Sequence, residues 1–252
     1  MTFARRRYRR DNYCYLLGEG GDAALVDPGD AEAAASLAAE HGVRPRFIIH
    51  THGHPDHAGG SAALRGRFRA RVLGHPGDAA WFAPDLDLAA GPLRLGALEL
   101  RIHPVPGHTP GSVLVEWRGR LLAGDTLFWG GAGNCRHGGD PGLLADSFLS
   151  VLSGLDGALE VHPGHDYAEA NLPFVLDLEP GNAAAAGRLA AARKSRAAGR
   201  EPEAPTLAAE RLANPFLRAA SPEVAEALAR KGMDVAGSRE AFLALRRLRD
   251  AW

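Results

Sequence analysis

Apolar residues occur in short runs separated by turns over the first two thirds of the chain. Residues 12–17 and 23–26 flank a Gly-rich turn, which predicts a β-hairpin. Asp30 precedes an alanine-rich segment that extends to about Glu40, and this arrangement predicts a capped helix. Apolar runs predict further strands at 46–50, 72–73, 98–105, 113–117, 121–123 and 158–162. Helical periodicity predicts a helix that begins the segment 58–68 and an amphipathic helix at 143–152.

The composition changes after Tyr167, where alanine, leucine and arginine dominate and the strand pattern ends. Helical periodicity predicts four helices, near 168–178, 181–198, 222–231 and 238–250, and the Pro-rich segment 201–206 predicts a loop. We therefore expect two domains, residues 1–167 and residues 168–252, of which the second is helical.

Composition and charge narrow the class of protein. Of the 252 residues, 46% are hydrophobic and 23% are charged, as in ordinary globular proteins, and the formal net charge is -1. No overall positive field attracts nucleic acid or an anionic membrane, so we expect neither as a partner. We expect a monomer, although no sequence pattern indicates the oligomeric state. The two cysteines fit a reducing cytoplasm.

The basic run at residues 5–10 resembles an export signal only superficially, because Asp11 and Asn12 follow where an apolar stretch is needed. We read this run as a solvated basic edge before the first strand. No window approaches the roughly 18 uninterrupted apolar residues of a membrane span.

Residues 50–60 read HTHGHPDHAGG, which places four histidines and an aspartate in eight positions. His52 and His54 are two residues apart, so on an extended segment they project to one side and can bind one ion. Asp56 and His57 are adjacent, and on a turn entering a helix they can serve a second ion. Imidazole suits zinc, iron and related metals, while a carboxylate can bridge two of them.

Three further candidates follow apolar strands: His108 in VPGHTPGS, Asp125 in LLAGDTLF and His165 in HPGHDY. Loops beyond strand ends are where such sheets carry their sites. These seven residues together predict a two-metal hydrolytic centre. Of the other histidines, we expect His41, His75 and His137 on the surface and His50, His103 and His162 as hydrogen-bonding partners of the ligands.

Other hydrolytic and nucleotide-binding sites lack their residues here. The chain has no G-x-S-x-G elbow, and Cys135, although close to His137, has no third member of a triad. The glycines at 130, 131 and 133 are not followed by the Lys and Ser/Thr of a phosphate-binding loop.

The sequence THGHPDHAGG resembles the T-H-x-H-x-D-H signature of the metallo-β-lactamase fold, and PGHTPGS, AGDTLF and PGHDY match the remaining ligand motifs in order. The segments GHDYAEANLPFVLDLEPGN, PTLAAERLANPFLR and LRRLRD resemble the C-terminal half of glyoxalase II, the hydroxyacylglutathione hydrolases. The resemblance implies an α/β fold, a four-layer αββα sandwich with a C-terminal helical domain. Residues 1–167 would then be catalytic and residues 168–252 would bind substrate.

The family pattern implies His52, His54 and His108 on one metal, Asp56, His57 and His165 on the other, and Asp125 between them. The cofactor is expected to be two divalent ions, zinc or else iron or manganese. We expect a hydroxide bridging the metals to attack the thioester carbonyl, with Asp56 or Asp125 orienting or deprotonating it, because metal coordination lowers the pKa of water to roughly 7.

The resemblance also implies a substrate, S-D-lactoylglutathione, which is hydrolysed to D-lactate and glutathione. Its glutathione half would contact Tyr167, Arg136, Arg246 and Arg249. A solvated helix face is the other interpretation of the arginines at 246, 247 and 249.

Two departures from the family pattern concern the substrate. The loop after Asp125 is longer by about two residues and has His137 and Gly138 where aromatic residues are expected, and Gly53 and Pro55 replace bulkier residues, which we expect to open that wall of the site. Another thioester or a lactone is therefore an alternative substrate. An iron-dependent persulfide dioxygenase and a non-catalytic metal-binding protein are the remaining alternatives.

Overall fold

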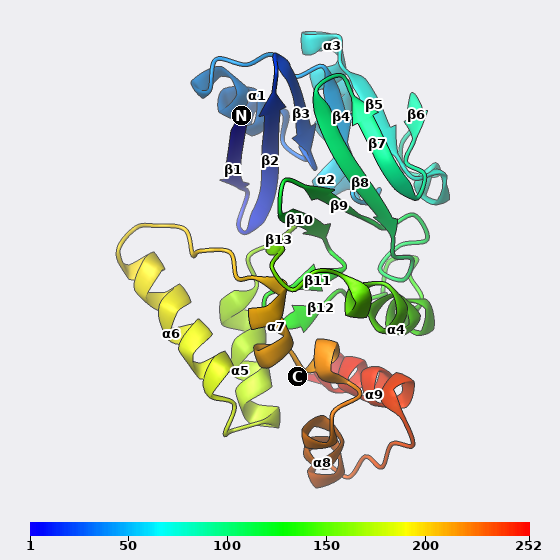
Figure 1. The fold of residues 1–252 in the computed structure, drawn as a ribbon, viewed down its shortest axis with the longest axis vertical. Helices are drawn as coiled ribbons and strands as arrows, with labels where there is room; N and C mark the ends of the chain where they lie inside the picture. Colours follow the sequence, from blue (N-terminus) through cyan, green and yellow to red (C-terminus); the bar gives the residue numbers. More distant parts are fainter.

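Two β-sheets lie face to face at the centre of the computed structural model, which describes residues 1–252 (Figure 1). The first sheet has the strand order β1-β2-β3-β4-β5-β6: β1 (Thr2–Tyr8), β2 (Asn12–Glu19), β3 (Asp22–Val26), β4 (Phe47–Ile49), β5 (Arg71–Gly74) and β6 (Leu86–Asp87). The second has the order β13-β10-β9-β8-β7: β7 (Gly91–Leu95), β8 (Leu98–Pro104), β9 (Val113–Trp117), β10 (Arg120–Gly124) and β13 (Glu160–Pro163). A separate two-stranded ribbon pairs β11 (Leu127–Phe128) with β12 (Gly131–Ala132).

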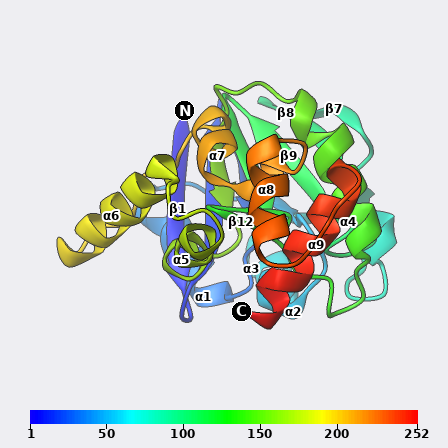
Figure 2. The ribbon, with the colours of Figure 1, turned by 90° about the horizontal axis from the view of Figure 1, so that it is seen from below.

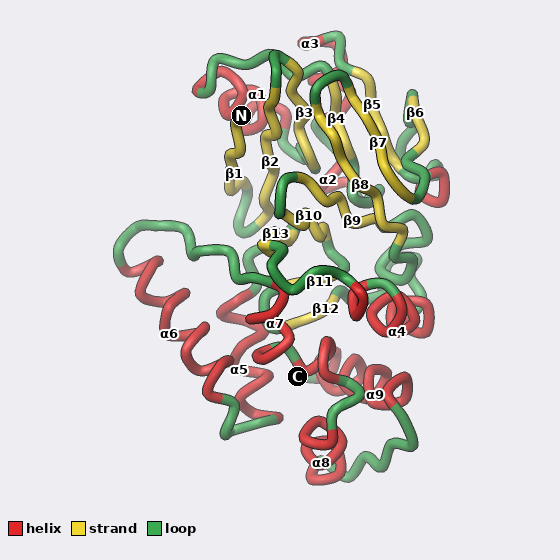
Figure 3. Tube along the Cα trace, viewed as in Figure 1, coloured by secondary structure: helices red, strands yellow, loops and turns green.

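The helices divide between the outer faces of the sheets and one end of the molecule (Figure 3). Those in the first part of the chain are α1 (Ala31–Glu40), α2 (Pro55–Ala58), α3 (Ser61–Phe68) and α4 (Pro141–Ser150), with 3₁₀ turns η1 (Pro76–Asp78) and η2 (Leu152–Gly154). Those in the last part are α5 (Ala168–Leu178), α6 (Ala183–Ala197), α7 (Leu207–Ala213), η3 (Pro215–Arg218), α8 (Pro222–Arg230) and α9 (Ser238–Ala251).

Three hydrophobic clusters separate four layers. A cluster that includes Leu37 of α1, Leu64 of α3 and Leu16 of β2 fills the space between helices α1 and α3 and the first sheet. A second cluster, with Tyr15 and Trp117, lies between the sheets, where alternate residues of each strand point inward. The third covers the outer face of the second sheet with α4 and the C-terminal helices. The predicted αββα sandwich with its helical extension is confirmed.

The predicted elements are largely confirmed, and β1 is the main correction. Asp30 caps α1 by accepting a hydrogen bond from Ala33 N, as its sequence position predicts. Arg5, Arg6 and Arg7 of the basic run lie within β1, which pairs antiparallel with β2 along its whole length, and Arg9 and Arg10 are exposed in the turn that follows, so the run does not precede the first strand. Arg5 is only partly exposed, because its guanidinium packs over the Tyr13 ring and donates to Pro202 O.

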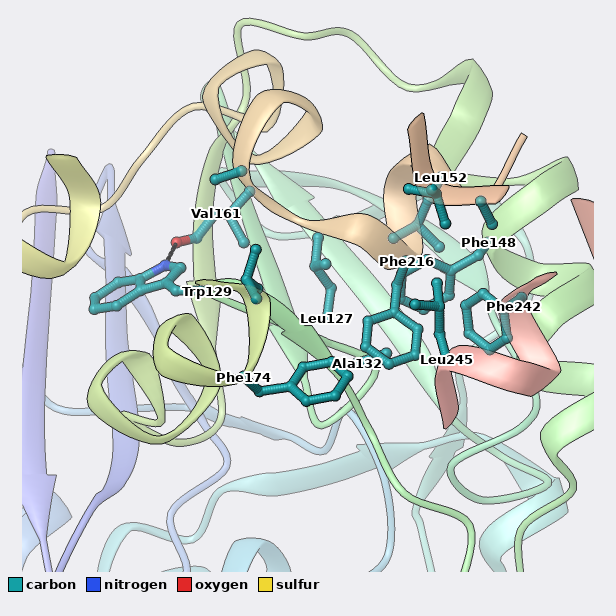
Figure 4. Packing of buried hydrophobic residues seen from close by; sticks show 14 of the residues in the cluster. Leu127, Trp129, Ala132, Phe148, Leu152, Val161, Phe174, Phe216, Phe242 and Leu245 are labelled. Atoms are coloured by element: carbon teal, nitrogen blue, oxygen red, sulfur yellow. Dashed lines mark hydrogen bonds between the residues drawn. The ribbon is translucent and has the colours of Figure 1, made fainter. Parts of the chain in front are cut away.

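The third cluster runs without a break across residue 167. Figure 4 shows Val161 of β13 and Phe174 of α5 in the same cluster, with Phe148, Phe216 and Phe242 packed together, and Trp129 Nε1 donating to Val161 O at 2.9 Å. In Figure 2, α5, α7, α8 and α9 lie across one end of the molecule, and α6 projects to one side. The helices predicted after Tyr167 are confirmed, whereas the short helix α7 was not predicted. The domain division at residue 167 stays a prediction.

The strand directions place several loops at one edge of the sandwich. Strands β3, β4 and β5 are parallel in the first sheet, and β10 and β13 are parallel in the second. The segments that begin at Asp27, His50, Asp125 and Gly164 leave the carboxyl ends of β3, β4, β10 and β13, which is where sheets with helical faces commonly build their sites. Among the helices, none has both the length and the apolar character that a membrane span requires.

Candidate metal centre

All seven predicted ligands come together at this edge. His52 and His54 follow β4, and Asp56 and His57 lie in the short helix α2, which Pro55 begins. The other three stand in loops: His108 between β8 and β9, Asp125 after β10 and His165 after β13. The folding of four separate segments against one another is therefore needed to assemble the group.

The first ligand group consists of His52, His54 and His108, whose candidate ligand atoms lie within 4.8 Å of one another. His54 Nδ1 and His108 Nε2 are 3.0 Å apart. His52 Nε2 is buried and has no hydrogen-bond partner. A buried ring nitrogen without a hydrogen-bond partner, facing two other imidazoles, is the arrangement expected of a metal ligand.

The second ligand group consists of Asp56, His57 and His165. The Nε2 atoms of the two histidines are 3.1 Å apart, and Asp56 Oδ2 lies 3.6 Å from His57 Nε2 and 3.2 Å from His165 Nε2. Two imidazoles and one carboxylate thus converge on a single point.

Asp125 lies between the two groups. Its Oδ1 is 3.3 Å from His57 Nε2, and its Oδ2 is 3.4 Å from His165 Nε2 and 3.7 Å from His108 Nε2. Oδ1 is buried and accepts no hydrogen bond. One carboxylate therefore faces ligands of both groups, the position that a bridging ligand occupies.

The outer nitrogen of each histidine in the two groups is already engaged with an oxygen. His54 Nε2 donates to His137 O at 3.1 Å, and His108 Nδ1 donates to Asn134 O at 2.6 Å. His57 Nδ1 is 3.3 Å from Asp27 Oδ2, and His165 Nδ1 is 2.8 Å from Asp11 Oδ1.

The hydrogen bonds of Thr51 show which ring nitrogen of the fifth histidine, His52, carries a proton. Thr51 Oγ1 donates to Asp27 Oδ2 at 2.6 Å, so it accepts from His52 Nδ1 at 3.2 Å. In all five histidines the nitrogen that faces the other ligands is consequently not the one bonded to these oxygens, so it can bind an ion once any proton on it is released. Bonds of this kind fix the tautomer and the ring orientation of metal-ligating histidines.

The donor set fits two divalent transition-metal ions. It offers imidazole nitrogens and carboxylate oxygens, the ligands that zinc, iron and manganese accept, and it has no thiolate. The unpartnered atoms His52 Nε2 and Asp125 Oδ1 both face the shared centre. We conclude that the residues present can hold a divalent metal in each group.

Charge is distributed unequally over the two groups. Burial lowers the pKa of His57, but the nearby carboxylates of Asp125 and Asp27 outweigh burial and raise this pKa to about 10. Burial also lowers the pKa of His165, and the carboxylates of Asp125, Asp56 and Asp11 outweigh it and raise this pKa to about 11. Burial and the neighbouring histidines instead hold the pKa of His52 well below its usual value. Protons compete with metal at the second group, so metal binding there releases protons.

Three acidic residues that the sequence analysis did not select hold the ligands in place. Asp27 accepts from Thr51 N at 2.8 Å as well as from the side chains described above. Asp78 accepts from Gly53 N, Thr109 Oγ1 and Gly111 N, each at 2.7 Å, and so ties the His52 loop to the His108 loop. Asp11 reaches His165 from the β1–β2 turn.

Of these three, only Asp27 carried a usable signal, since it directly follows the apolar strand β3, as Asp125 follows β10. Glycines also allow the close packing of the centre. A Cβ on Gly164 would lie 2.3 Å from Asp125 Oδ1, and one on Gly133 would lie 2.0 Å from Asp125 O. Any side chain at either position would displace the aspartate between the groups.

Two cavities open beside the ligands. The first, of about 500 Å³, is lined by His54, Asp56, His108, Asp125 and His165 together with Pro55, Trp81, Asn134, His137 and Tyr167. The second, of about 220 Å³, shares Asn134 and Tyr167 with the first and adds Arg136, Arg246 and Arg249. The four residues predicted to bind glutathione therefore all line the second cavity.

The guanidinium groups of the three arginines differ in how far their donors are already used within the protein. Arg246 is buried, donates through Nη1 to Ala132 O at 2.7 Å and Gly133 O at 3.1 Å, and pairs with Asp250 at 2.9 Å. Arg249 donates to Asn171 Oδ1 at 3.3 Å and 3.2 Å, and Arg136 is exposed and bonds Asp250 O at 2.7 Å. Arg246 is thus bound within the protein, whereas Arg249 and Arg136 keep donors free.

The remaining histidines divide differently from the prediction. His50 is buried, its Nε2 lies 2.6 Å from Ser61 Oγ, and its Nδ1 is 4.0 Å from Asp27 Oδ1 without a hydrogen-bond partner, so it makes no hydrogen bond to a ligand. His103 pairs with Glu116 and His162 with Glu160, and neither bonds a ligand, which corrects that expectation. His137, expected on the surface, is exposed but lines the first cavity, and its carbonyl accepts from His54.

Comparison with known proteins points to one family. The sequence model described as the metallo-beta-lactamase superfamily matches residues 7–252. A protein of Anaeromyxobacter dehalogenans (strain 2CP-C) named hydroxyacylglutathione hydrolase is 64% identical over 253 residues, with 99% of each chain covered. A protein of the same name from Acidiphilium cryptum (strain JF-5) is 40% identical and covers 88% of this chain and 92% of its own.

Solved structures agree on the fold. The structure of ETHE1 from Myxococcus xanthus superposes with a TM-score of 0.67 at 24% identity, covering 100% of this chain and 99% of the other, which shows the fold alone. The structure of TTHA1623 in a di-iron-bound form superposes with a TM-score of 0.56 at 32% identity, covering 64% of this chain and 90% of the other.

Proposed function

The chain belongs to the metallo-beta-lactamase superfamily and, within it, to the hydroxyacylglutathione hydrolases, and we propose that it hydrolyses glutathione thioesters such as S-D-lactoylglutathione to a hydroxy acid and glutathione. The observation that carries the proposal is the convergence of seven candidate ligand side chains, five of which line a cavity that shares two residues with a cation-lined one. A carbonyl placed at the ligands thus has room for an anionic thiol portion beside it.

His52, His54 and His108 would hold one divalent ion, Asp56, His57 and His165 the other, and Asp125 would contact both. Such ions, zinc or else iron or manganese, supply hydroxide at neutral pH and polarise the thioester carbonyl. Asp27 and Asp11 hold the rings of His57 and His165 in the required orientation. Asp56, whose side chain is 34% exposed and lines the first cavity, orients the attacking water by accepting its hydrogen bond.

The thiol half of the substrate occupies the second cavity in this proposal. Glutathione carries carboxylates, and Arg249 and Arg136 offer donors to them while Tyr167 offers its hydroxyl at the boundary between the cavities. Because a thiolate leaves readily, the reaction requires no strong general acid, and no side chain needs to protonate it.

A second candidate is the same centre acting on another thioester or a lactone. It is favoured by one observation, the engagement of Arg246 with two backbone carbonyls and Asp250, which removes one of the predicted glutathione contacts. The location of the protein in the cytoplasm and its monomeric state stay predictions from the sequence.

The test is steady-state hydrolysis by the metal-loaded protein of S-D-lactoylglutathione, a lactoyl coenzyme A thioester and a simple lactone. We expect saturable turnover of the glutathione thioester with kcat/KM above about 10⁴ M⁻¹s⁻¹, the low end of the enzyme range, and far less with the other two. Equal or faster turnover of either alternative would reject glutathione as the natural thiol and leave the hydrolytic centre in place.

A further inference from the structure

An indole side chain lines the first cavity and is absent from the cation-lined second one. Trp81 lies in the segment between η1 and β6 and is 39% exposed. Its ring meets the ring of His54 edge to face, with the centroids 5.5 Å apart and the planes at 72°. It lines the first cavity and takes no part in the second.

Two glycines from distant loops provide the room for this indole. A Cβ on Gly53 would lie 2.9 Å from Trp81 Cε3 and 3.0 Å from Trp81 Cβ. A Cβ on Gly138 would lie 3.3 Å from Trp81 Cη2. The expectation that Gly53 opens this wall is therefore wrong, because a residue from a third segment fills the space.

The ligands lie between two aromatic side chains. Tyr167 stacks on His165 of the second group, with centroids 4.8 Å apart and planes at 9°, and Trp81 contacts His54 of the first group. Tyr167 borders the cation-lined cavity, whereas Trp81 does not. When the thiol half of a thioester extends past Tyr167 and its carbonyl lies at the ligands, its acyl half points toward Trp81.

We infer that Trp81 is a specificity-determining residue whose indole forms the wall of the acyl subsite and favours acyl groups that carry an aromatic substituent. The other residues around the first cavity are histidines, aspartates, Asn134, Tyr167 and Pro55, so the indole is its largest apolar surface. Aromatic rings gain free energy from contact with one another in addition to the apolar area that they bury. This inference rests on the proposed function for the direction in which the substrate lies.

Hydrolysis of two thioesters that share a thiol tests the inference. We expect Trp81→Ala to lower the ratio of kcat/KM for S-D-mandeloylglutathione to that for S-D-lactoylglutathione by about fivefold to tenfold, because the phenyl ring loses its partner. Trp81→Phe, which keeps an aromatic face, should keep most of the wild-type ratio. A ratio that is unchanged or higher in Trp81→Ala would overturn the inference.

A binding measurement separates this inference from the proposed function. Thioethers cannot be hydrolysed, so the ratio of calorimetric Kd values for S-methylglutathione and S-benzylglutathione reports the subsite even if no thioester is turned over. We expect the preference of the wild type for the benzyl compound to fall several-fold in Trp81→Ala. If that preference is retained in Trp81→Ala, the inference is wrong, whatever the enzyme hydrolyses.

Two further variants act as controls. Trp252→Ala removes an exposed tryptophan that lines the second cavity, so it should change the affinities for both thioethers in parallel and leave their ratio intact. Gly53→Ala crowds the indole without removing it, and should lower the benzyl preference less in the Trp81→Ala background than in the wild type. Equal effects in both backgrounds would contradict the contact between the two residues.

Discussion

In the metal centre, each of the five histidines forms a hydrogen bond to an oxygen through the ring nitrogen that points away from the other ligands. In the neighbouring cavity, by comparison, the arginine side chains are bonded by groups that also line the cavity. His57 and His165 are fixed by Asp27 and Asp11, which bind no substrate in the proposed function. By contrast, Arg136 and Arg246 both pair with Asp250, a carboxylate on the wall of the cavity that they are predicted to serve.

The difference indicates what each region tolerates. The metal centre is preorganised, so loss of one supporting group is felt directly by the ligands. In the second cavity a substrate carboxylate has to compete with Asp250 for the same guanidinium groups, so affinity there depends on exchange of partners. We expect changes in the metal centre to affect turnover and metal content, and changes in the cavity to affect substrate affinity.

The largest effect is expected from removal of the carboxylate between the two groups. Asp125→Ala should lose at least one metal ion and lower kcat by about 10³-fold or more, since metal-assisted stabilisation amounts to several kcal/mol. Metal analysis by mass spectrometry and steady-state kinetics measure both. Asp146→Ala, which removes an exposed carboxylate paired with Arg239, is the control. A variant that keeps two metals and near-normal turnover contradicts the bridging role.

Asp27 tests whether support from behind the ligands matters. Asp27→Asn keeps the shape but removes the charge beside His57 Nδ1, and it should weaken metal binding about 10- to 100-fold. Competition with a chromophoric chelator measures the affinity. If the loss is confined to one of two ions, it should be the ion of the second group; unchanged affinity for both would show that the metal centre is no more preorganised than the cavity.

Arg249 tests the cavity. Arg249→Ala should raise KM for S-D-lactoylglutathione about tenfold, with a smaller change in kcat, because a well-placed charged hydrogen bond contributes about 1.5 kcal/mol or more. Arg246→Ala should instead lower the free energy of unfolding, because the carbonyls of Ala132 and Gly133 lose their buried donor. An unchanged KM in Arg249→Ala would show that Arg249 belongs to a solvated helix face and does not bind substrate.

The smallest effect concerns a buried carboxyl in helix α7, outside both regions. Glu210 accepts a hydrogen bond from Gly130 N at 2.9 Å, and burial raises its pKa from 4.5 to about 7. A raised folded-state pKa stabilises the protein below pH 4.5, and that contribution is lost as the pH rises through 7. Between pH 6 and pH 8 the wild type should lose about 1 kcal/mol of unfolding free energy relative to Glu210→Gln. Urea unfolding at both values measures it, and parallel changes in the two proteins would refute the assignment.

Local patterns made the clustering of the seven candidate ligands predictable, because each stands in a turn after an apolar strand or inside one short motif. The supporting residues depend on contacts that sequence spacing does not show. Asp11 and His165 are 154 residues apart, and Asp78 bonds Gly53 and Gly111 from a different loop. Asp27 is the exception, because it directly follows the apolar strand β3 as Asp125 follows β10.

The substrate side was less predictable because its residues come from segments that meet only in the folded chain. The glycine at position 53 indicates an open wall when it is considered alone, and only the structure brings Trp81 against it. The basic run was predicted to be solvated because its charge gives no sign that Arg5 packs over Tyr13. Helix α7 has seven residues, too few for a periodic pattern to be distinguished from a loop.

The most direct test of the account is a titration of metal-free protein with Zn²⁺ while hydrolysis of S-D-lactoylglutathione is followed in the same solution. The two ligand groups with Asp125 between them predict that full turnover appears only as the second equivalent of metal binds. Full turnover with one equivalent, or no turnover with two equivalents bound, would contradict a two-metal thioester hydrolase.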